Sequence, residues 1–328
     1  MQIGKLKALT PMVIVYVILL VIGLTVPGMW QPVVYFMFYV ALGQAFNIFL
    51  GLTGYVDFGY VAFLGLGAYG MAIALQSFAH LGLIAIPIGI VLAVIMSVLL
   101  SMAVGAVALR LRGAYFAIAT IGVNEGFRFL LVGTKLWGGS EGIVLSGFMR
   151  KAFGREIANY LSTFVSDLLL FLVAFLAALT TVVILNRKMG YALLALREDE
   201  DAARVMGINV TKYKIMAFIT SAAFAGLIGA IAWTLKLTYV FPEDVFNIHY
   251  TVEAIVIVML GGAGTLIGPM IGGLIYGILK YYLSVIFPGV QLLILAPLLI
   301  ITIVAFPEGV AGYLIKRTRN SRLAEYLR

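Results

Sequence analysis

The sequence predicts an all-α, polytopic integral membrane protein with about ten transmembrane helices. Three observations predict this class: 63% of the 328 residues are hydrophobic, only 11% are charged, and the mean hydropathy is +1.11. A membrane-spanning helix needs about 20 mostly apolar residues, and runs of that length recur along the chain. No stretch between the runs is long enough to bury a core of its own, so residues 1–328 are expected to form a single transmembrane domain.

The apolar runs are separated by polar segments or by segments that contain proline and glycine. The first run ends at Pro27, and Trp30, a residue typical of membrane interfaces, follows without a small-residue cleavage site. We therefore expect this run to be a retained span rather than a signal peptide. The expected spans are 11–27, 33–50, 57–79, 83–109, 114–133, 163–185, 214–235, 250–266, 269–287 and 290–306.

The 22 lysines and arginines lie mainly at the ends of the expected spans and do not form one patch. Placing both termini in the cytoplasm puts most of these residues on the cytoplasmic side, where positive charge is normally enriched. The charged loop 190–214 and the basic tail 316–328 then face the cytoplasm too. We therefore expect a multi-pass membrane protein, surrounded by lipid and with no nucleic-acid partner; the resemblance described below implies the inner (plasma) membrane of a prokaryote.

Glycines gather in two apolar stretches, one in each half of the chain. One interpretation is that the chain has two related halves with glycine-interrupted helices near a translocation path. The other is close helix packing through small residues, and the sequence leaves both open. The clusters are Gly51, Gly54, Gly59, Gly65, Gly67 and Gly70, and then Gly261, Gly262, Gly264, Gly268, Gly272 and Gly273.

The sequence lacks the residue patterns of an enzyme. It contains no cysteine, and its two histidines, His80 and His249, stand alone, so no metal or cofactor site is expected. It also lacks the Gly-x-x-x-x-Gly-Lys-Ser/Thr loop that cradles the phosphates of ATP. These observations indicate a conduit rather than a catalyst.

Polar residues within spans are informative because each is costly in lipid. Thr120, Asn124 and Arg128 recur every fourth residue in the fifth expected span and share one helix face. Glu125 precedes Arg128 by three residues and can pair with it. This face either lines or gates a translocation path, or it holds a neutralised pair that fixes helix packing.

Further polar residues lie in and just after the second expected span. Gln44 and Asn47 occupy one side of that span, and Asp57 follows where the chain turns. Asp57 is either a hydrogen-bond anchor or part of the path. The complete set of candidate path residues is Asn47, Asp57, Thr120, Asn124 and Arg128.

Two other charged residues fall at expected spans in the second half of the chain. Glu253 opens the eighth span close to the outside, where it is expected to be solvated. Lys280 is flanked by Tyr281 and Tyr282 in the ninth span. Aromatic neighbours fit a lysine whose charged end reaches the membrane interface, so no functional role is assigned to either residue.

The loop 190–214 is the most charged window of the chain. Its segment 193–206 has the composition of a short helix, and Gly207 is expected to end that helix because glycine accepts positive φ. Asn209 and Thr211 are suitable N-caps for the helix that follows. Ala202 and Ala203 form a small-residue face that lets another surface approach closely. The alternative is a solvated connector.

The pattern from Asp201 to Gly207 resembles the Glu-Ala-Ala-three-residues-Gly loop of ABC importer permeases, with Asp201 in place of the glutamate. In those permeases the loop docks onto the ATP-hydrolysing subunit. The resemblance therefore implies a set of ATPase-coupling residues in this chain. They are Glu200, Asp201, Ala202, Ala203, Arg204 and Gly207.

Several stretches in order resemble the permeases of branched-chain amino-acid ABC transporters. The resemblance implies an importer in which this chain works with a second, related permease, two cytoplasmic ATPase subunits and an extracytoplasmic solute-binding protein. It does not fix the solute, because similar permeases serve urea, short amides and other small acids. The stretches are 59–69, 110–120, 190–214, 253–269 with the glycine motif 260–265, and 306–309.

Two other classes of function are open to the sequence. A secondary transporter driven by an ion gradient would need a buried acid as its coupling site, and the candidates are Asp57, Glu125 and Asp167. The acidic loop with its Ala-Ala pair argues against this class. A membrane enzyme would need a catalytic cluster at one membrane face, and the sequence shows none.

Overall fold

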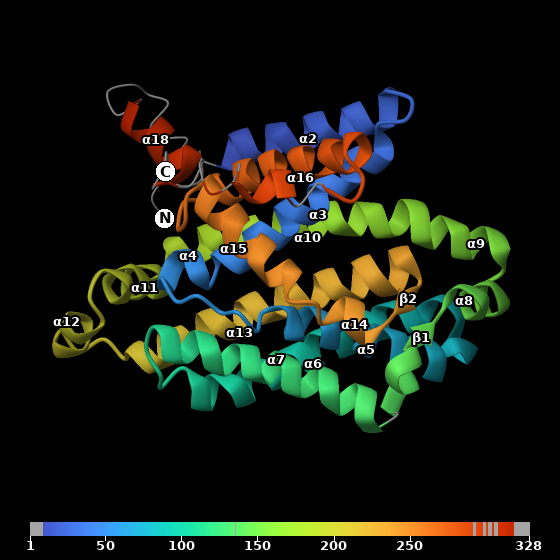
Figure 1. Ribbon diagram of the computed structural model, residues 1–328, viewed down its shortest axis with the longest axis horizontal. Helices are drawn as coiled ribbons and strands as arrows, with labels where there is room; N and C mark the ends of the chain where they lie inside the picture. The colour runs from blue at the N-terminus through green and yellow to red at the C-terminus, as the bar shows by residue number, and fades with distance from the viewer. Residues whose placement is uncertain are drawn as a thin grey trace. The chain divides into compact units, whose positions relative to one another are not determined.

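The computed structural model describes residues 9–134, 136–290, 293–297, 300, 304 and 308–317, and these are mostly helical. They form two compact units, each assembled from segments that are distant in the sequence. Unit 1 draws on residues 1–54, 174–213 and 253–328, and unit 2 on residues 55–173 and 214–252. Three of the four boundaries fall within helices labelled in Figure 1, namely α10 (Ser166–Leu185), α13 (Val210–Gly229) and α15 (His249–Gly261), and the fourth, between residues 54 and 55, follows α4 (Leu50–Thr53).

Unit 1 contains long helices that pack along one another and short helices that follow them. The helix α3 packs against both α2 and α16, and α11 packs against both α4 and α12. Besides its parts of the shared helices, the described portion of the unit holds α2 (Leu9–Thr25), α3 (Trp30–Asn47), α4 (Leu50–Thr53), α11 (Lys188–Glu198), α12 (Glu200–Val205), α16 (Gly268–Ile286) and α18 (Gly309–Arg317).

Unit 2 is built around α5, which packs extensively against α6. Its two short strands, β1 (Ile143–Val144) and β2 (Tyr239–Val240), pair in antiparallel register. A π-helical segment, Ala230–Leu237, continues α13. The remaining elements are α5 (Val61–Ser77), a 3-10 helix (Ala79–Ile84), α6 (Ala85–Ala108), α7 (Ala114–Thr134), a 3-10 helix (Leu136–Glu141), α8 (Ser146–Phe153), α9 (Arg155–Tyr160), a π-helical turn (Leu161–Val165) and α14 (Pro242–Val245).

Nine of the ten expected spans coincide with helices among the described residues. Seven helical segments are long and apolar enough to cross a membrane, and α2 and α5 are shorter apolar helices. The chain is therefore an all-α polytopic membrane protein. The tenth expected span, 290–306, and the basic tail, 316–328, lie largely outside the described residues. The seven segments run over 30–53, 79–108, 114–134, 155–185, 210–237, 242–261 and 268–286.

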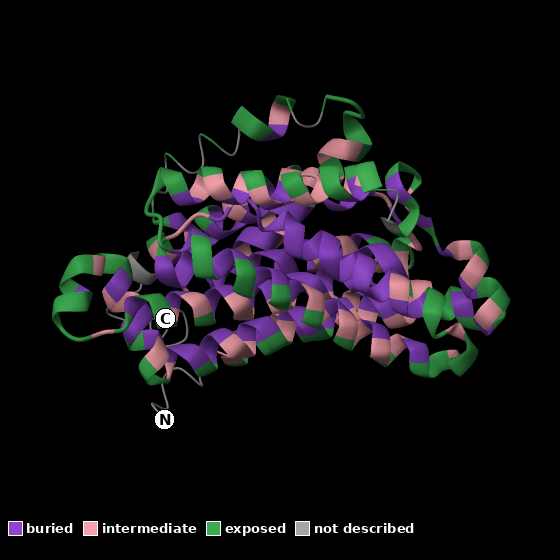
Figure 2. Ribbon diagram, turned by 90° about the horizontal axis from the view of Figure 1, so that it is seen from below, coloured by how far each residue is buried: buried purple, intermediate pink, exposed green. Residues whose placement is uncertain are grey.

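The burial of the helices follows from their composition. Figure 2 shows how buried and exposed residues alternate along the ribbon. The helices α3 and α5 are buried on nearly every side, as expected for helices that are apolar all round. In contrast, α6 and α7 expose apolar side chains such as Val107, which is 72% exposed, and Ile118, which is 66% exposed. Lipid is the solvent that suits such surfaces.

Several clustered glycines lie where two helix backbones meet. In unit 2, a Cβ at Gly67 of α5 would collide with the backbone of Gly226 in α13. In unit 1, a Cβ at Gly273 of α16 would lie 2.7 Å from the Cα of Val40 in α3. Small residues let membrane helices approach to this distance, so close packing accounts for these glycines in both units.

Candidate coupling loop and transport-path residues

The charged loop contains two short helices rather than the single helix expected over 193–206. The break is at Asp199, whose backbone is extended at φ −154° and ψ 114°. Its carboxylate accepts hydrogen bonds from the backbone N–H groups of Asp201 and Ala202, both at 2.9 Å. Asp199 is therefore the N-cap of α12. The prediction of one helix was wrong because composition favours helix here while a local capping bond starts a second one.

The end of α12 follows the expectation. Gly207 has φ 81°, which confirms that a residue tolerant of positive φ closes this helix. The side chain of Asn209 accepts a hydrogen bond from the backbone N–H of Lys212 at 3.1 Å, which confirms it as a cap for α13. The backbone conformation of Gly207 and the side-chain cap of Asn209 thus fix the connection from α12 to α13.

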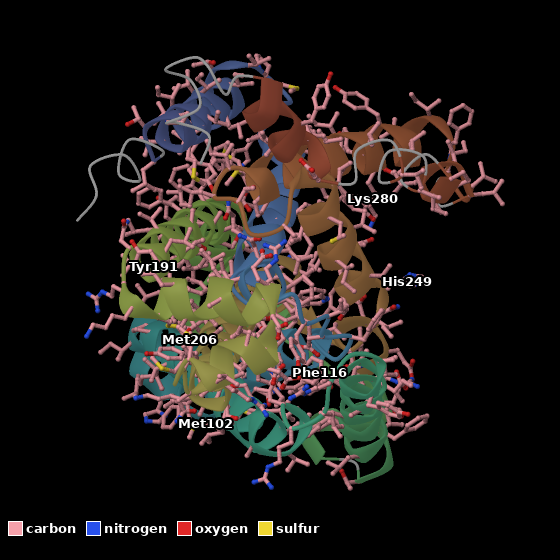
Figure 3. The ribbon with its side chains drawn as sticks, turned by 90° about the vertical axis from the view of Figure 1, so that its left-hand side faces the viewer. Met102, Phe116, Tyr191, Met206, His249 and Lys280 are labelled. Atoms are coloured by element: carbon pink, nitrogen blue, oxygen red, sulfur yellow. The ribbon has the colours of Figure 1, made fainter. Side chains whose placement is uncertain are left out.

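The two adjacent alanines of the loop, Ala202 and Ala203, differ in exposure. Ala202 is exposed, but Ala203 is only 4% exposed and lies inside the loop. The expectation that both alanines form an open face was therefore wrong for Ala203. The exposed apolar residues at the end of α12 are Val205 and Met206, whose exposed fractions are 87% and 81%. Figure 3 labels Met206 together with Tyr191, an exposed residue of α11.

The charged residues of α12 interact with one another. Arg204 donates a hydrogen bond to Glu200, four residues earlier, at 2.6 Å. The Glu200 side chain is 11% exposed and that of Arg204 is 48% exposed. Glu200 and Asp201 lie in the first turn of the helix, where negative charge is favoured by the helix dipole. The arrangement stabilises α12 and leaves its apolar end uncovered.

A groove of about 630 Å³ lies between α11 and the turn into α13. Its lining includes Lys188 and Tyr191 of α11 and Lys212 and Tyr213 of α13, with Gly207 between them. Both lysines and Tyr191 are exposed. The groove therefore has a positive, aromatic rim, a combination that the sequence analysis did not predict because its residues come from two helices.

Asn47, the candidate path residue of unit 1, holds the loop between α15 and α16. We call residues 262–267 the glycine loop. The side chain of Asn47 accepts a hydrogen bond from the Gly264 N–H at 2.9 Å and donates one to the Thr265 carbonyl at 3.1 Å. Gln44, one turn earlier, donates to the Leu266 carbonyl at 3.4 Å. These two amides of α3 therefore fix the conformation of the glycine loop.

In unit 2, the structure brings Asp57, Thr120 and Asn124 into the protein interior. All three are buried. The Thr120 hydroxyl accepts a hydrogen bond from the backbone N–H of Phe58 at 3.1 Å, and Asn124 donates to the carbonyl of Phe246 at 3.0 Å. One face of α7 therefore contacts both the segment before α5 and the end of α14.

Asp57 lies in the non-helical segment between α4 and α5 and is 1% exposed. One carboxylate oxygen accepts a hydrogen bond from the Gly59 N–H at 2.9 Å. The other oxygen is buried without a hydrogen-bond partner, as is the side-chain oxygen of Asn124. Buried polar atoms are normally paired; the other unpaired buried side-chain oxygens among the described residues belong to Tyr16, Gln44, Tyr69 and Glu253.

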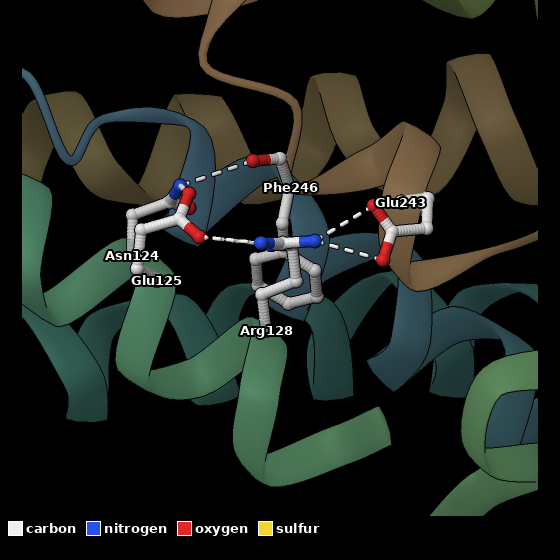
Figure 4. A network of polar contacts seen from close by, with 5 residues as sticks. All are labelled: Asn124, Glu125, Arg128, Glu243 and Phe246. Atoms are coloured by element: carbon white, nitrogen blue, oxygen red, sulfur yellow. Dashed lines mark hydrogen bonds and ion pairs between the residues drawn. The ribbon is translucent and has the colours of Figure 1, made fainter. Parts of the chain in front are cut away.

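Arg128 is the centre of an ion cluster (Figure 4). Its guanidinium donates to both oxygens of Glu243 at 2.7 Å, and to Glu125 at 2.7 and 3.0 Å. The expected pair with Glu125 is therefore confirmed, and Glu243 of α14 is a second partner. Because one cation faces two carboxylates, the cluster carries a net negative charge.

Two further ion pairs join residues far apart in the sequence. Asp167 of α10, with a side chain that is 0% exposed, pairs with Lys236, and Glu253 of α15 pairs with Lys280 of α16. The expectation that Glu253 is solvated was wrong, because it is 6% exposed. Lys280 also lies over the ring of Tyr39, 5.2 Å from its centre. Of the candidate acids for ion coupling, Glu125 and Asp167 are thus already paired.

The described part of the chain contains no group of three or more histidine, aspartate or glutamate residues that could hold a metal ion. Its polar groups instead form two kinds of site. One is the exposed loop of α11 and α12, and the other comprises polar groups among apolar helices that form ion pairs or hydrogen bonds with other segments. Together with the seven helical segments that are able to cross a membrane, this combination defines a multi-pass membrane protein.

The chain belongs to the family of permease components of branched-chain amino acid transport systems, whose sequence profile matches residues 29–303. It is 33% identical over 294 residues to the high-affinity branched-chain amino acid transport system permease protein LivM of Escherichia coli, covering 83% of this chain and 67% of the relative. LivH of the same system type and organism is 25% identical over 289 residues, covering 84% of this chain and 91% of the relative. No solved structure matches.

Proposed function

We propose that this protein is the membrane-spanning subunit of an ATP-driven ABC importer for branched-chain amino acids or similar small solutes. Family membership supports the transport role, and the missing phosphate loop supports a source of energy outside the chain. In this proposal two cytoplasmic ATPase subunits, a second related permease and an extracytoplasmic solute-binding protein complete the complex. The chain has about ten spans, and both termini face the cytoplasm.

The uncovered end of α12 is the observation that carries the proposal. Val205 and Met206 are large apolar residues at 87% and 81% exposure on an otherwise charged loop. An exposed apolar patch bordered by polar residues marks an interaction site. We assign this surface, with Glu200, Asp201, Ala202, Arg204 and the closing Gly207, to contact with an ATPase subunit; Ala203 supports it from inside.

The groove beside α12 belongs to the same proposed contact. Lys188 and Lys212 make its rim positive, and Tyr191 and Tyr213 give it aromatic walls. Charge complementarity favours an acidic segment of the ATPase subunit as the occupant. Because the groove lies between α11 and α13, a segment bound there contacts both helices that lead away from α12.

The test is co-purification of the ATPase subunits with the wild-type protein and with Met206→Asp. Fully burying a methionine contributes about 1.5–3 kcal/mol, which corresponds to roughly a 10- to 100-fold change in affinity. We expect Met206→Asp to weaken ATPase binding by this amount without affecting membrane insertion. Val144→Asp, at a residue of β1 that is 59% exposed, is the matched control. Equal binding by the two variants would rule out α12 as the docking surface.

We also propose that Asp57, Thr120, Asn124 and Arg128 border the translocation path, and that Asn47 acts on transport through the glycine loop. The unpartnered carboxylate oxygen of Asp57 supports this role, because a buried acidic residue in a membrane protein is costly and normally serves a function. An amino acid carries an ammonium group that suits this carboxylate. Asn124 offers a second unpartnered oxygen on the same unit.

Asp57→Asn tests this role while keeping the acceptor for the Gly59 N–H. We expect the KM for amino-acid uptake to rise about tenfold or more, which is a loss of about 1.4 kcal/mol. The corresponding carboxylic acid, which lacks the amino group, should inhibit amino-acid uptake equally well in the variant and in the wild type. Glu156→Gln, which removes an exposed acid of α9, is the control. An unchanged KM in Asp57→Asn would show that Asp57 is only a hydrogen-bond anchor.

A further inference from the structure

Arg197, near the end of α11, bonds to the backbone of two other segments of unit 1. One terminal nitrogen of its guanidinium donates to the carbonyl of Gly51 in α4 at 2.7 Å and to the carbonyl of Ala263 in the glycine loop at 3.3 Å. Neither partner is charged. Arg197 is thus held by hydrogen bonds to backbone carbonyls rather than by an opposite charge. Its side chain connects α11 with α4 and with the glycine loop, which are distant in the sequence.

The two carbonyl groups are available because each lies where a helix ends. Gly51 belongs to the four-residue helix α4, and Ala263 follows the end of α15 at Gly261. The last carbonyls of a helix such as α4 lack partners within it and carry partial negative charge, so they favour a cation; the Ala263 carbonyl lies in the turn two residues beyond the end of α15. Arginine suits this position because its rigid fork presents several donors at once.

The surrounding glycines leave room for the Arg197 side chain. Gly264 has φ 76°, and a Cβ there would overlap the Arg197 guanidinium. Gly54 has φ 75°, and a Cβ there would lie 3.4 Å from the Arg197 side chain. Both positions therefore favour glycine because of their positive φ. At Gly264, glycine is also needed because a side chain would block the approach of Arg197.

The bonds continue from the glycine loop into the membrane-spanning part of unit 1. Asn47 of α3 bonds to Gly264 and Thr265, and Gln44 bonds to Leu266. At the other end, α11 packs against α12. A continuous series of contacts thus leads from the exposed end of α12 through Arg197 and the glycine loop to α3.

We propose that Arg197 is the positioning residue that transmits movement of the coupling loop to the break between α15 and α16. This inference rests on the proposed docking of an ATPase subunit at α12. Displacement of α12 moves α11, and the bonds of Arg197 oblige α4 and the glycine loop to follow. Packed helices and hydrogen-bond networks are the physical means by which such coupling travels.

The experiment uses the complete transporter, reconstituted in lipid, with Arg197→Gln, Arg197→Lys and the control Arg187→Gln. Arg187 is an exposed cation at the start of the same helix. For Arg197→Gln we expect ATPase binding and basal ATP hydrolysis within twofold of wild type, but at least a tenfold fall in solute transported per ATP. Arg197→Lys, which keeps the charge but not the fork, should fall between wild type and Arg197→Gln. Arg187→Gln should match wild type.

Three results would overturn the inference. They are normal transport per ATP in Arg197→Gln, normal transport per ATP in Arg197→Lys, and an equal fall in Arg187→Gln. Failure of the proposed function has a different signature, because the wild-type permease would then show neither ATPase binding nor ATP-dependent uptake. The ratio of transport to hydrolysis separates transmission from a structural defect, since a destabilised permease loses both activities in proportion to its yield.

Discussion

Arg128 and Lys236 of unit 2 are held differently from Arg197 of unit 1, although unit 1 also contains an ion pair between Lys280 and Glu253. In unit 2, Arg128 lies between Glu125 and Glu243, and Lys236 pairs with the buried Asp167. In unit 1, Arg197 bonds to the neutral backbone carbonyls of Gly51 in α4 and Ala263 in the glycine loop. An ion pair is strong but leaves a costly charge behind when one partner is lost. A cationic side chain that is bonded only to carbonyl groups can be replaced with less loss of stability. Such a side chain therefore suits a contact that transmits movement between helices.

The largest effect of this difference is expected at Lys236. Lys236→Met leaves the fully buried carboxylate of Asp167 without its cation, and breaking a buried pair in this manner costs about 3–5 kcal/mol. The measurement is thermal unfolding of the purified permease. The double variant Lys236→Met/Asp167→Leu should recover most of the loss because it removes the orphaned charge. A single variant as stable as wild type would contradict this account of unit 2.

A smaller effect is expected at the glycine loop. Gly264→Ala forces a side chain into positive φ, at about 1–2 kcal/mol, and also displaces Arg197. Gly28→Ala is the control, because Gly28 has φ 82° but open space within 4 Å of the position that a Cβ would take. Gly264→Ala should lose more stability than Gly28→Ala, because its Cβ would also lie 2.6 Å from the Gly51 carbonyl oxygen, and only Gly264→Ala should lose transport per ATP. If Gly264→Ala and Gly28→Ala transport equal amounts of solute per ATP, Arg197 does not take part in coupling.

The smallest effect is expected at the break between α11 and α12. Asp199→Ala removes an N-cap, which costs about 0.5–2 kcal/mol. Because the loop is exposed, this loss should appear as local opening rather than global unfolding. Limited proteolysis at residues 199–206 should be faster than in wild type, while the unfolding temperature should change little. Asp199→Ser, which retains a capping oxygen, should be cleaved at nearly the wild-type rate.

The fold was largely predictable because membrane spans depend on local hydropathy. Nine expected spans correspond to helices, and Gly207 ends α12 as its conformational freedom indicates. The break at Asp199 was missed, although an aspartate followed by two acidic residues is an N-terminal helix signal. That signal competed with a helix-forming composition on both sides. The local sequence alone did not decide between the two.

The candidate sites were less predictable because they depend on contacts between distant residues. The Arg128–Glu125 pair was predicted from a spacing of three residues. The pairs Lys236–Asp167 and Lys280–Glu253 leave no such spacing in the sequence. Arg197 was also missed, because its partners are carbonyl groups and any residue type supplies those. The burial of Ala203 depends on how the loop folds back on itself, which composition does not encode.

The most direct test of the central claim is hydrogen exchange in the peptide covering residues 261–268, measured with and without the ATPase subunits. In this region the Gly264 N–H bonds to Asn47 and the Gly268 N–H bonds to the Thr265 hydroxyl. We predict that ATPase binding at α12 changes exchange in this peptide in the wild type and in Arg187→Gln, but not in Arg197→Gln. An equal change in all three proteins would show that the coupling loop reaches the membrane helices without Arg197.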